Sequence, residues 1–580
     1  MAFSLHRSLR NIACHSAGSQ KLSKTAAYLT LQCSAFSTSA NRAKLPSLQP
    51  THNANADFKG RKEALLASEK EMYPVISDEP LYQRISDIRK KYDHMSAEEL
   101  AALDSSDVDS KLTVRGRIAS IRAQGNKLLF LDITQEECKI QAIYRLNAIA
   151  AGDEDRFRKS WEWLRRGDFV SVTGTLSRTR AGELSVRATS EIKLLSPCLH
   201  PIPLTLSSDQ TRSHNRTVDL LVHSAARDIL RARAFILTYL RSFFSARDFL
   251  EVQTPILSDV AGGAAARPFV THANALGRAS ESSSSTSTPL ELRIAPELWL
   301  KRLIISGFDR VFEIGQVFRN EGIDATHNPE FTTCEFYQAF ASLDDLISLT
   351  EELLSGLVRS AVEKVPVIST NIQSNEFKFD APFARVDFVS TLESRLGITI
   401  PDFVLNSSAD SEEAKQYLER LFVTNDVPLP NPPTVARMLD RLGDHVIGPI
   451  LENAKTPVFL MNFPEVCSPL AKSAKAAGKD YMLARRFELY VAGKELVNAY
   501  EEENSPFAQR RKFELQFRDR EVDAEAHTTD EGYLASMEWG LPPTGGWGIG
   551  IDRLVMLLTG TERISDVLTF GGIKGVVGQE

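Results

Sequence analysis

Three glycines alternate with larger residues near the end of the 580-residue chain, at Gly546, Gly548 and Gly550. Because successive side chains of a β-strand point to opposite faces, this spacing leaves one face of a strand without side chains. A planar ligand can lie against the backbone there, and Arg553 follows in the first turn of a predicted helix. The spacing fits neither a Walker loop, which ends in Gly-Lys-Ser/Thr, nor a Rossmann G-x-G-x-x-G turn. The chain therefore does not belong to either of these nucleotide-binding folds.

A predicted hairpin brings an arginine, an aromatic ring and carboxylates together. Arg310–Arg319 and Glu330–Tyr337 have the pattern of two strands joined by a polar loop. Alternation places four side chains on one face of the second strand, which Arg319 can close from the first: Phe331, Thr333, Glu335 and Tyr337. Such a set suits an anion, a flat base and an ammonium group together, although an exposed polar sheet face is an alternative interpretation.

A second predicted hairpin, Arg486–Glu502, turns at Ala492–Gly493 and places Glu488 and Glu495 on adjoining strands. Paired carboxylates on rigid strands are suited to Mg²⁺, which proteins commonly hold with one or two carboxylates plus substrate phosphates. A like-charge pair relieved by lysine is the alternative. Together with the two arginines, Phe331 and the glycine strand, the carboxylates describe a site for bent ATP.

The N-terminal part predicts a separate small barrel. Five short segments with alternating apolar residues lie between Val114 and Arg187, which suits a five-stranded barrel of the OB type in a domain spanning 111–200. Residues 57–110 predict a helical extension. In the barrel, Phe130 is a candidate for stacking on an unpaired RNA base, although a place in the barrel core is the alternative. The candidate readers of base edges are Arg122, Gln141 and Glu183.

The first 56 residues contain none of the chain's 75 acidic residues and are rich in serine and basic residues. This composition is typical of a mitochondrial transit peptide and predicts import into the mitochondrial matrix. The alternative is a disordered basic tail on a cytosolic protein; a secretory signal is disfavoured because no apolar core follows the first arginines. No apolar run is long enough to cross a bilayer, so membrane insertion is not expected. Six widely spaced cysteines indicate neither a disulfide framework nor a cysteine zinc site.

Several segments resemble the three signature motifs of class II aminoacyl-tRNA synthetases. These are Phe249–Pro255, Phe318–Gly322 with His327–Phe331, and Gly546–Arg553. Phe249–Pro255 is itself predicted to be a strand, after one long amphipathic helix from Asn215 to about Ala246. Gly262–Phe269, Arg293–Leu298 and Asn498–Glu502 are similar to the lysyl-tRNA synthetase versions, and the leader extends the resemblance to mitochondrial members. The resemblance implies an α+β fold, in which the OB barrel is followed along the chain by a catalytic domain over 201–580. This domain would consist of an antiparallel sheet flanked by helices, with a helical insertion at about 343–479.

The resemblance also implies ligands for each part of the site. Arg319 would bind the α-phosphate and the lysine carboxylate, Arg553 the γ-phosphate, and both are the catalytic residues. The ATP-binding residues would be Arg319, Glu321, His327, Asn328, Phe331, Gly550 and Arg553, with Mg²⁺ held by Glu488 and Glu495. The lysine-binding residues would be Gly263, Glu297, Arg319, Glu335, Tyr337, Asn498, Tyr500 and Glu502.

The resemblance implies that the chain forms lysyl-adenylate from L-lysine and ATP and transfers lysine to tRNA(Lys), as a homodimer. An aspartyl- or asparaginyl-tRNA synthetase of the same fold is disfavoured, because Glu335 and Glu502 suit a cationic side chain. The sequence also leaves open a silent RNA-binding paralogue and a ligase that modifies proteins. Two stretches depart from the family pattern, the serine-rich segment 277–289 and Phe570–Gly572.

Overall fold

The structure is a computed structural model that describes residues 52–67, 71–76, 81–106, 111–264, 266–273, 289–406, 412–519 and 530–572. The predicted leader, up to residue 51, and the serine-rich segment, up to residue 288, lie outside the described residues. Within the described residues that precede the barrel, the helices are α2 (His52–Ala67), α3 (Ile85–Tyr92) and α4 (Ala97–Ser106). Among the helices that the structure describes, none combines the length and apolarity needed to cross a membrane.

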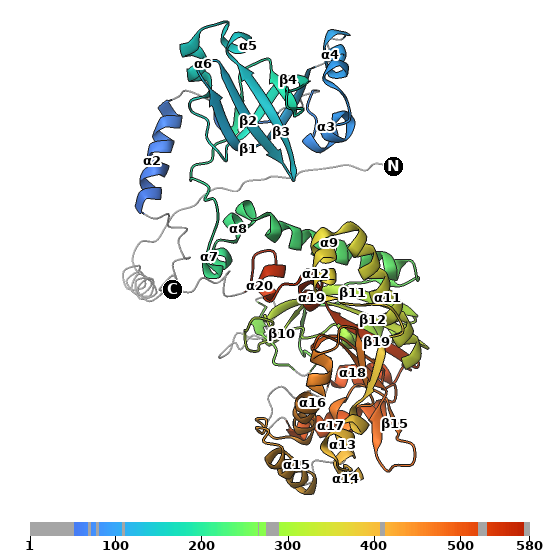
Figure 1. Ribbon diagram of the computed structural model, residues 1–580. Helices are drawn as coiled ribbons and strands as arrows, with labels where there is room; N and C mark the ends of the chain where they lie inside the picture. The colour runs from blue at the N-terminus through green and yellow to red at the C-terminus, as the bar shows by residue number, and fades with distance from the viewer. Residues whose placement is uncertain are drawn as a thin grey trace, which may run out of the picture. The chain divides into compact units, whose positions relative to one another are not determined.

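The predicted barrel is present as a closed sheet (Figure 1). Its strands are β1 (Lys111–Gln124), β2 (Leu128–Gln135), β3 (Cys138–Arg145), β4 (Phe169–Arg178), β5 (Leu184–Ala188) and β6 (Lys193–Ser196). The order β1-β2-β3-β5-β4 closes because β1 pairs with both β2 and β4, and β6 adds a short strand beside β4 that was not predicted. Two helices, α5 (Leu146–Ala150) and α6 (Glu154–Trp161), follow β3. Alternating apolar residues such as Leu129, Leu131 and Ile133 fill the interior, which confirms the predicted OB fold.

The segment after the barrel is broken into shorter helices than its apolar pattern predicts. The expected helix from Asn215 to Ala246 is divided at His223 into α8 (Arg216–Val222) and α9 (Ser224–Ser245), after a short α7 (Asp209–His214). Asp219 is fully buried and accepts hydrogen bonds from Arg212 and Arg216, and its carboxylate also contacts the His223 ring at 2.7 Å. This polar cluster holds the break, which apolar periodicity alone does not reveal.

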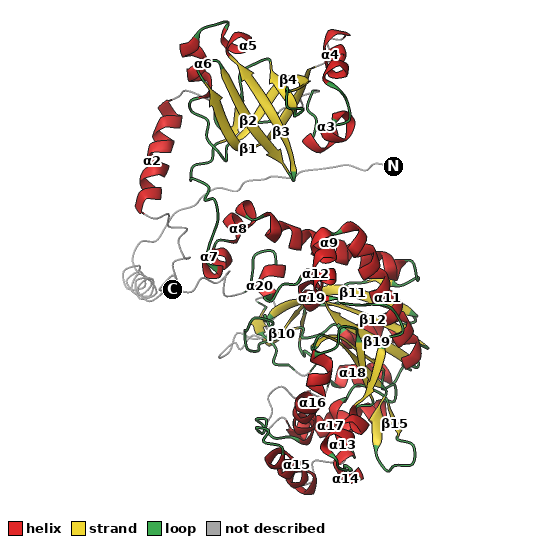
Figure 2. Ribbon diagram, viewed as in Figure 1, coloured by secondary structure: helices red, strands yellow, loops and turns green. Residues whose placement is uncertain are grey.

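An eight-stranded sheet forms the centre of the C-terminal part (Figure 2). Its order is β13 (Ala384–Asp387), β14 (Val458–Met461), β17 (Arg486–Val491), β18 (Lys494–Glu501), β19 (Thr544–Gly550), β12 (Glu330–Ala339), β11 (Arg310–Phe318) and β7 (Leu250–Glu251). All neighbouring pairs are antiparallel except β11 with β7 and β13 with β14. The strand expected over Phe249–Pro255 is reduced to the two residues of β7, because only Leu250 and Glu251 pair with β11.

Helices cover one face of this sheet with an apolar layer (Figure 1). They are α9, α11 (Leu343–Lys364), α12 (Pro366–Asn375) and α19 (Ile551–Thr559). Phe336 of β12 and Trp547 of β19 stack in this layer with ring centroids 5.1 Å apart. Because side chains alternate along each strand, the neighbours of these residues point to the opposite face, where the polar side chains lie.

Smaller elements surround the opposite face. Helices α10 (Glu297–Ile305), α17 (Pro506–Asp519) and α18 (Glu531–Met537) share a second apolar cluster with Tyr337 of β12. A third cluster lies around β14 and the helices α13 (Phe388–Leu396), α14 (Asp402–Leu405), α15 (Glu412–Thr424) and α16 (Val435–Glu452). The remaining elements are β8 (Leu257–Ser258), β9 (Val270–His272), β10 (Pro289–Leu292), β15 (Ser473–Lys475), β16 (Met482–Ala484), the 3-10 helix Glu465–Cys467 and α20 (Ile564–Val567). The interval 343–479 is therefore mostly helical, but its strands β13 and β14 belong to the central sheet.

Candidate active site

The register of three neighbouring strands brings the predicted polar residues together. The glycine strand β19 lies between β12 and β18, so Gly546 and Gly548 have a partner on both sides, while Gly550 pairs with Thr333 of β12. Gly548 is opposite Glu335 and Asn498, and Gly546 is opposite Tyr337 and Tyr500. The glycines thus form a low row between two walls of larger side chains, and the prediction that alternate residues of β12 share a face is confirmed.

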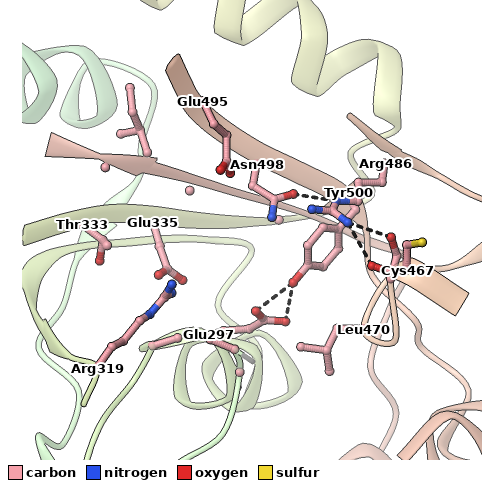
Figure 3. Close-up of a pocket in the computed structure, with 18 of the residues that line it drawn as sticks. Glu297, Arg319, Thr333, Glu335, Cys467, Leu470, Arg486, Glu495, Asn498 and Tyr500 are labelled. Atoms are coloured by element: carbon pink, nitrogen blue, oxygen red, sulfur yellow. Dashed lines mark hydrogen bonds between the residues drawn. The ribbon is translucent and has the colours of Figure 1, made fainter. Parts of the chain in front are cut away.

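These walls enclose a cavity of about 640 Å³. Nearly all the residues predicted for ATP and lysine line it: Gly263, Glu297, Arg319, Glu321, His327, Asn328, Phe331, Glu335, Tyr337, Glu495, Asn498, Tyr500, Gly550 and Arg553. Two predicted residues, Glu488 and Glu502, are buried and are not among the lining side chains. Residues from the loop after β11, from helix α10 and from three strands therefore converge on one space, as Figure 3 shows for several of them.

One end of the cavity is acidic. Glu297 begins helix α10, and both of its carboxylate oxygens accept the Tyr500 hydroxyl at 2.8 Å (Figure 3). Glu335 lies nearby and accepts the Tyr337 hydroxyl at 3.3 Å. Burial raises the pKa of Glu335 to about 8, and repulsion from Glu297 adds to the shift while Arg319 opposes it. An ammonium group entering this end would favour the ionised form of Glu335.

The buried carboxylate of Glu502 already has a cationic partner within the chain. Its side chain contacts the ammonium of Lys301, which also donates to Glu297 at 2.5 Å. The carboxylate lies directly against the backbone of Gly546, because a Cβ added there would meet Glu502 Oε1 at 1.9 Å. Glu502 is therefore buried against Gly546 at the edge of the cavity and is not one of the residues that line it.

The three glycines leave different amounts of free space. A Cβ on Gly546 would also meet the Tyr337 ring at 2.7 Å, and one on Gly548 would meet Glu335 Cγ at 3.3 Å. At Gly550 the nearest atom is the Cβ of Arg553, at 4.0 Å. The space released by the first two glycines is thus taken up by the chain's own side chains, and only Gly550 leaves room for a flat ligand.

The other end of the cavity carries two arginines. The Arg319 guanidinium lies 5.1 Å from the centre of the Phe331 ring and points toward Glu335 (Figure 3). Arg553 contacts the His327 ring at 2.9 Å and lies 3.5 Å from the Glu495 carboxylate. Planar guanidinium groups bind phosphate and carboxylate oxygens in two-pronged fashion, so this end suits an anion.

The loop before β12 is held by its own short-range bonds. The Asp324 carboxylate accepts the backbone N–H groups of Thr326 and His327 at 2.7 and 2.8 Å and lies 2.9 Å from the His327 ring. The bond from the Thr326 N–H is the largest of the causes that lower the pKa of Asp324 to about 2. The Asn328 side-chain amide donates to the Glu330 carbonyl at 2.7 Å. These bonds fix the loop between β11 and β12, which carries four of the predicted ATP-binding residues.

The predicted metal-binding carboxylates lie on adjoining strands but in different surroundings. Glu488 of β17 is 9% exposed, contacts Arg486 and accepts the Tyr490 hydroxyl at 2.7 Å. Glu495 of β18 is half-buried at the cavity, where burial and repulsion from Glu488 raise its pKa to about 7. Like-charge repulsion of this kind is relieved by a divalent cation, so the pair fits Mg²⁺. Among the described residues, no group of three or more His, Cys, Asp or Glu side chains is arranged to hold a metal.

Two residues of the site were not predicted from the sequence. Arg486 is partly buried and donates to Asn498 Oδ1 at 2.9 Å, the Cys467 carbonyl at 3.1 Å and Ser468 Oγ at 3.0 Å (Figure 3). Lys301 lies one helical turn after Glu297, and the i, i+4 spacing of opposite charges on a predicted helix was a signal that could have found it. No comparable local signal links Arg486 to Cys467, because the contact depends on the fold.

Three of the predicted anticodon residues, Arg122, Phe130 and Gln141, lie on barrel strands, and Glu183 lies in the loop between β4 and β5. Phe130 and Arg122 are paired across β1 and β2, and Phe130 is half-buried rather than in the core. Gln141 is buried and accepts the Ser185 hydroxyl at 3.3 Å, while Glu183 contacts Arg89 at 3.2 Å. Phe130 thus keeps part of its ring exposed, as stacking on a base requires.

Comparison with known families places this site in a class. The family profile described as tRNA synthetases class II (D, K and N) matches residues 208–574, which include the sheet and every cavity residue named above. A second profile, described as an OB-fold nucleic acid binding domain, matches residues 112–194. The fold and the site are those of a class II tRNA synthetase.

Individual relatives narrow the class. The chain is 40% identical over 531 residues to the mitochondrial lysine–tRNA ligase of Schizosaccharomyces pombe, which covers 90% of this chain and 94% of the relative. It is 40% identical to a probable cytoplasmic lysine–tRNA ligase of Encephalitozoon cuniculi, over 79% of this chain and 86% of that one. It is 39% identical to a lysine–tRNA ligase of Clostridium tetani, over 80% of this chain and 88% of that one. The chain therefore belongs to the lysine–tRNA ligase family of class II tRNA synthetases.

Proposed function

We propose that the chain activates L-lysine with ATP and transfers the lysyl group to tRNA(Lys). The observation that carries the proposal is a single cavity with Glu297 and Glu335 at one end and Arg319 and Arg553 at the other. Lysine has two ammonium groups for the acidic end, and its carboxylate and the ATP phosphates are anions for the arginines. Of the two arginines, Arg319 points toward Glu335 of the acidic end, where the two substrates must meet.

The reaction begins with attack of the lysine carboxylate on the α-phosphorus of ATP, which gives lysyl-adenylate and releases pyrophosphate. Arg319 holds the attacking carboxylate and the α-phosphate, and Arg553 binds the γ-phosphate. No side chain need act as a nucleophile, because positioning and charge neutralisation lower the barrier. The lysyl group then passes to the terminal ribose of the tRNA.

In the amino-acid pocket, Gly263 and Glu297 receive the α-ammonium group of lysine. Glu335 and Tyr337 receive the ε-ammonium group. Glu502, buried against Gly546, adds negative charge to the pocket. Asn498 and Tyr500 complete the pocket. A neutral or shorter amino acid would leave these carboxylates unpaired, which is costly in a buried site.

In the nucleotide pocket, Phe331 stacks on adenine, and Glu321, His327, Asn328 and Gly550 surround the nucleotide. Glu488 and Glu495 hold Mg²⁺, which neutralises charge on the phosphates when bound. The register of β17 and β18 supports this role, since it brings the two carboxylates to adjoining strands beside Arg553.

The remaining parts of the chain bind the tRNA and direct the protein to its compartment. Residues 57–110 are a helical extension that precedes the anticodon-binding domain, residues 111–200. In this domain Arg122, Phe130, Gln141 and Glu183 contact the tRNA. Residues 201–580 are the catalytic domain with its insertion at about 343–479. Residues 1–56 direct the protein to the mitochondrial matrix, and two copies form a homodimer. Residues 1–56 fused to a fluorescent protein should reach the matrix, and light scattering of the purified protein should give twice the chain mass.

Lysine-dependent exchange of pyrophosphate into ATP tests the activity. The purified protein should catalyse exchange with lysine and not with aspartate, and should charge tRNA(Lys). Arg553→Ala and Glu495→Ala should nearly abolish exchange while leaving the protein folded. Exchange stimulated by aspartate instead would make the chain an aspartate enzyme, and no exchange with any amino acid would make it a silent paralogue.

A further inference from the structure

Lys301 is a lysine that the protein itself places beside the amino-acid pocket. It lies on α10 and its side chain is completely enclosed. Its ammonium group donates to Glu297 at 2.5 Å and contacts the Glu502 carboxylate. Lys301 does not line the cavity, but Glu297 does, and the Glu502 carboxylate lies against Gly546, which also lines it. Lys301 therefore acts on the pocket through other side chains.

Aromatic rings complete the surroundings of the ammonium. The nitrogen lies 5.9, 5.7 and 5.8 Å from the ring centres of Tyr337, Tyr500 and Tyr533. These rings and the two carboxylates are the titratable groups that face Lys301, and they come from α10, β12, β18 and α18. Burial alone lowers the pKa of Lys301, but the attraction of Glu297 and Glu502 outweighs it and raises the pKa. Lys301 thus stays charged although it is out of water.

The charges around this end of the cavity do not balance. When all three are ionised, Glu297, Glu335 and Glu502 exceed the ammonium of Lys301 by two charges, leaving aside Arg319, which the proposed function assigns to the substrate carboxylate and the α-phosphate. Free lysine carries two ammonium groups. Without Lys301 the excess would be three, which one lysine molecule cannot match.

We propose that Lys301 is a positioning residue for amino-acid selection. It holds Glu297 and Glu502 in place and sets the excess negative charge of the pocket to the two ammonium groups of one lysine substrate. The inference rests on the proposed function and adds the cause of its specificity. Lys301 touches neither substrate, so its removal should act on lysine binding and hardly on ATP.

The test is Lys301→Met, which keeps the length of the side chain and removes its charge. The KM for lysine in pyrophosphate exchange should rise about 100-fold, the size typical of removing one partner from a buried charge pair, while the KM for ATP changes less than about threefold. The carboxylates of the variant take up an additional proton when the pocket is empty, so lysine binding must release it. The slope of log KM for lysine against pH between 6 and 8 should therefore steepen by about one.

Chemical rescue separates charge from packing. Lys301→Ala removes three carbons and the ammonium, which n-propylamine matches. With n-propylamine added, the KM for lysine of this variant should be at least tenfold lower than with n-propanol, which has the same length and no charge. The wild-type protein is measured with the same two additions as a control.

A control variant removes a different buried cation. Arg61 pairs with buried Asp168 at 2.8 Å in the N-terminal part, and Arg61→Met should leave the KM for lysine in exchange unchanged. A folded Lys301→Met protein with wild-type KM for lysine and wild-type pH slope overturns the inference. If that variant does not fold, equal effects of n-propylamine and n-propanol on Lys301→Ala overturn it. Exchange by the wild-type protein tests the proposed function separately.

Discussion

At the scale of single residues, the pocket depends on glycines, which have no side chain, as much as on the side chains that line it. Gly546 has no Cβ, and this allows the Glu502 carboxylate and the Tyr337 ring to lie against the strand. Gly550 has free space above it instead. Two glycines four positions apart on one strand therefore belong to different halves of the site, one to the acidic pocket and one to the nucleotide pocket.

We expect Gly546→Ala and Gly550→Ala to differ in the substrate that they affect. The new Cβ at residue 546 would overlap Glu502 Oε1 and must displace it, so the KM for lysine should rise at least about tenfold. At residue 550 the Cβ enters the space for the nucleotide, so the KM for ATP should rise instead. Exchange kinetics with each substrate varied in turn measure both effects, and a rise in the same KM for both variants would contradict this division.

Glu335 should make lysine binding depend on pH. Its pKa of about 8 keeps the carboxyl protonated at lower pH, so an ammonium ligand must first ionise it. The KM for lysine should fall as the pH rises from 6 to 8, by up to about tenfold per pH unit. Glu335→Gln should remove most of this dependence and raise the KM at pH 8 by about 10- to 100-fold.

Glu330→Gln is the matched control for this experiment. Glu330 begins the same strand and its side chain is exposed, so the pH dependence should stay as in the wild-type protein. A Glu335→Gln variant that keeps the full slope would show that another group, such as Glu502, releases the proton.

At the scale of secondary structure, one buried carboxylate joins three elements. Asp552 of α19 is 2% exposed, pairs with Arg233 of α9 and accepts the Thr332 N–H of β12 at 2.7 Å. Arg233 also donates to the Thr332 hydroxyl at 2.9 Å. Asp552 is adjacent to Arg553, and Thr332 is adjacent to Phe331, so these bonds set the distance between two nucleotide-binding residues.

Arg233→Met should therefore weaken both the fold and ATP binding. It leaves the Asp552 charge buried without its cation, which typically costs about 3–5 kcal/mol of unfolding free energy. The KM for ATP should rise more than the KM for lysine. Chemical denaturation and exchange kinetics measure the two effects.

Arg241→Met on the same helix is the control. Arg241 pairs with Glu251 at 2.9 Å, but both side chains are largely exposed, so its loss should cost at most about 1 kcal/mol. Equal losses of stability in the two variants would show that the Asp552 cluster is no more than a surface contact.

Strand periodicity identified the two hairpins and the glycine strand, because each has one buried face and the alternation follows the pleat. It did not identify the division of the helix at His223, which depends on the side-chain cluster around Asp219. It also overestimated the strand over Phe249–Pro255, since a strand extends only as far as its partner offers backbone groups. Boundaries set by a distant partner are not visible in a local pattern.

At the scale of the whole molecule, the two matched domains should have separable tasks. The catalytic cavity is built entirely from residues between 263 and 564, whereas the predicted RNA contacts lie in the barrel domain. The chain has a formal net charge of −7, so net attraction cannot bring it to an RNA, and binding must come from local contacts and base stacking.

Phe130→Ala should lower kcat/KM for tRNA charging by about 10- to 100-fold, as expected for one lost stacking contact, and leave lysine-dependent exchange unchanged. Phe169→Ala removes another partly exposed phenylalanine of the barrel, which lies under Arg117, and should affect neither assay. Charging and exchange measured on the same preparations provide the comparison. Equal loss of both activities in Phe130→Ala would contradict the assignment of the barrel to the anticodon.

The sequence by itself determined the fold class and the barrel, because alternation and glycine spacing are local properties of strands, and most of the residues that it predicted for ATP and lysine line the cavity. Only the tertiary structure decided how these strands are ordered, with Gly546 and Gly548 between β12 and β18. It also decided that the Glu502 carboxylate is buried in contact with Lys301 and does not line the cavity. The physical reason is that a buried carboxylate takes the nearest available cation, and distances between α10 and β18 exist only once the chain has folded.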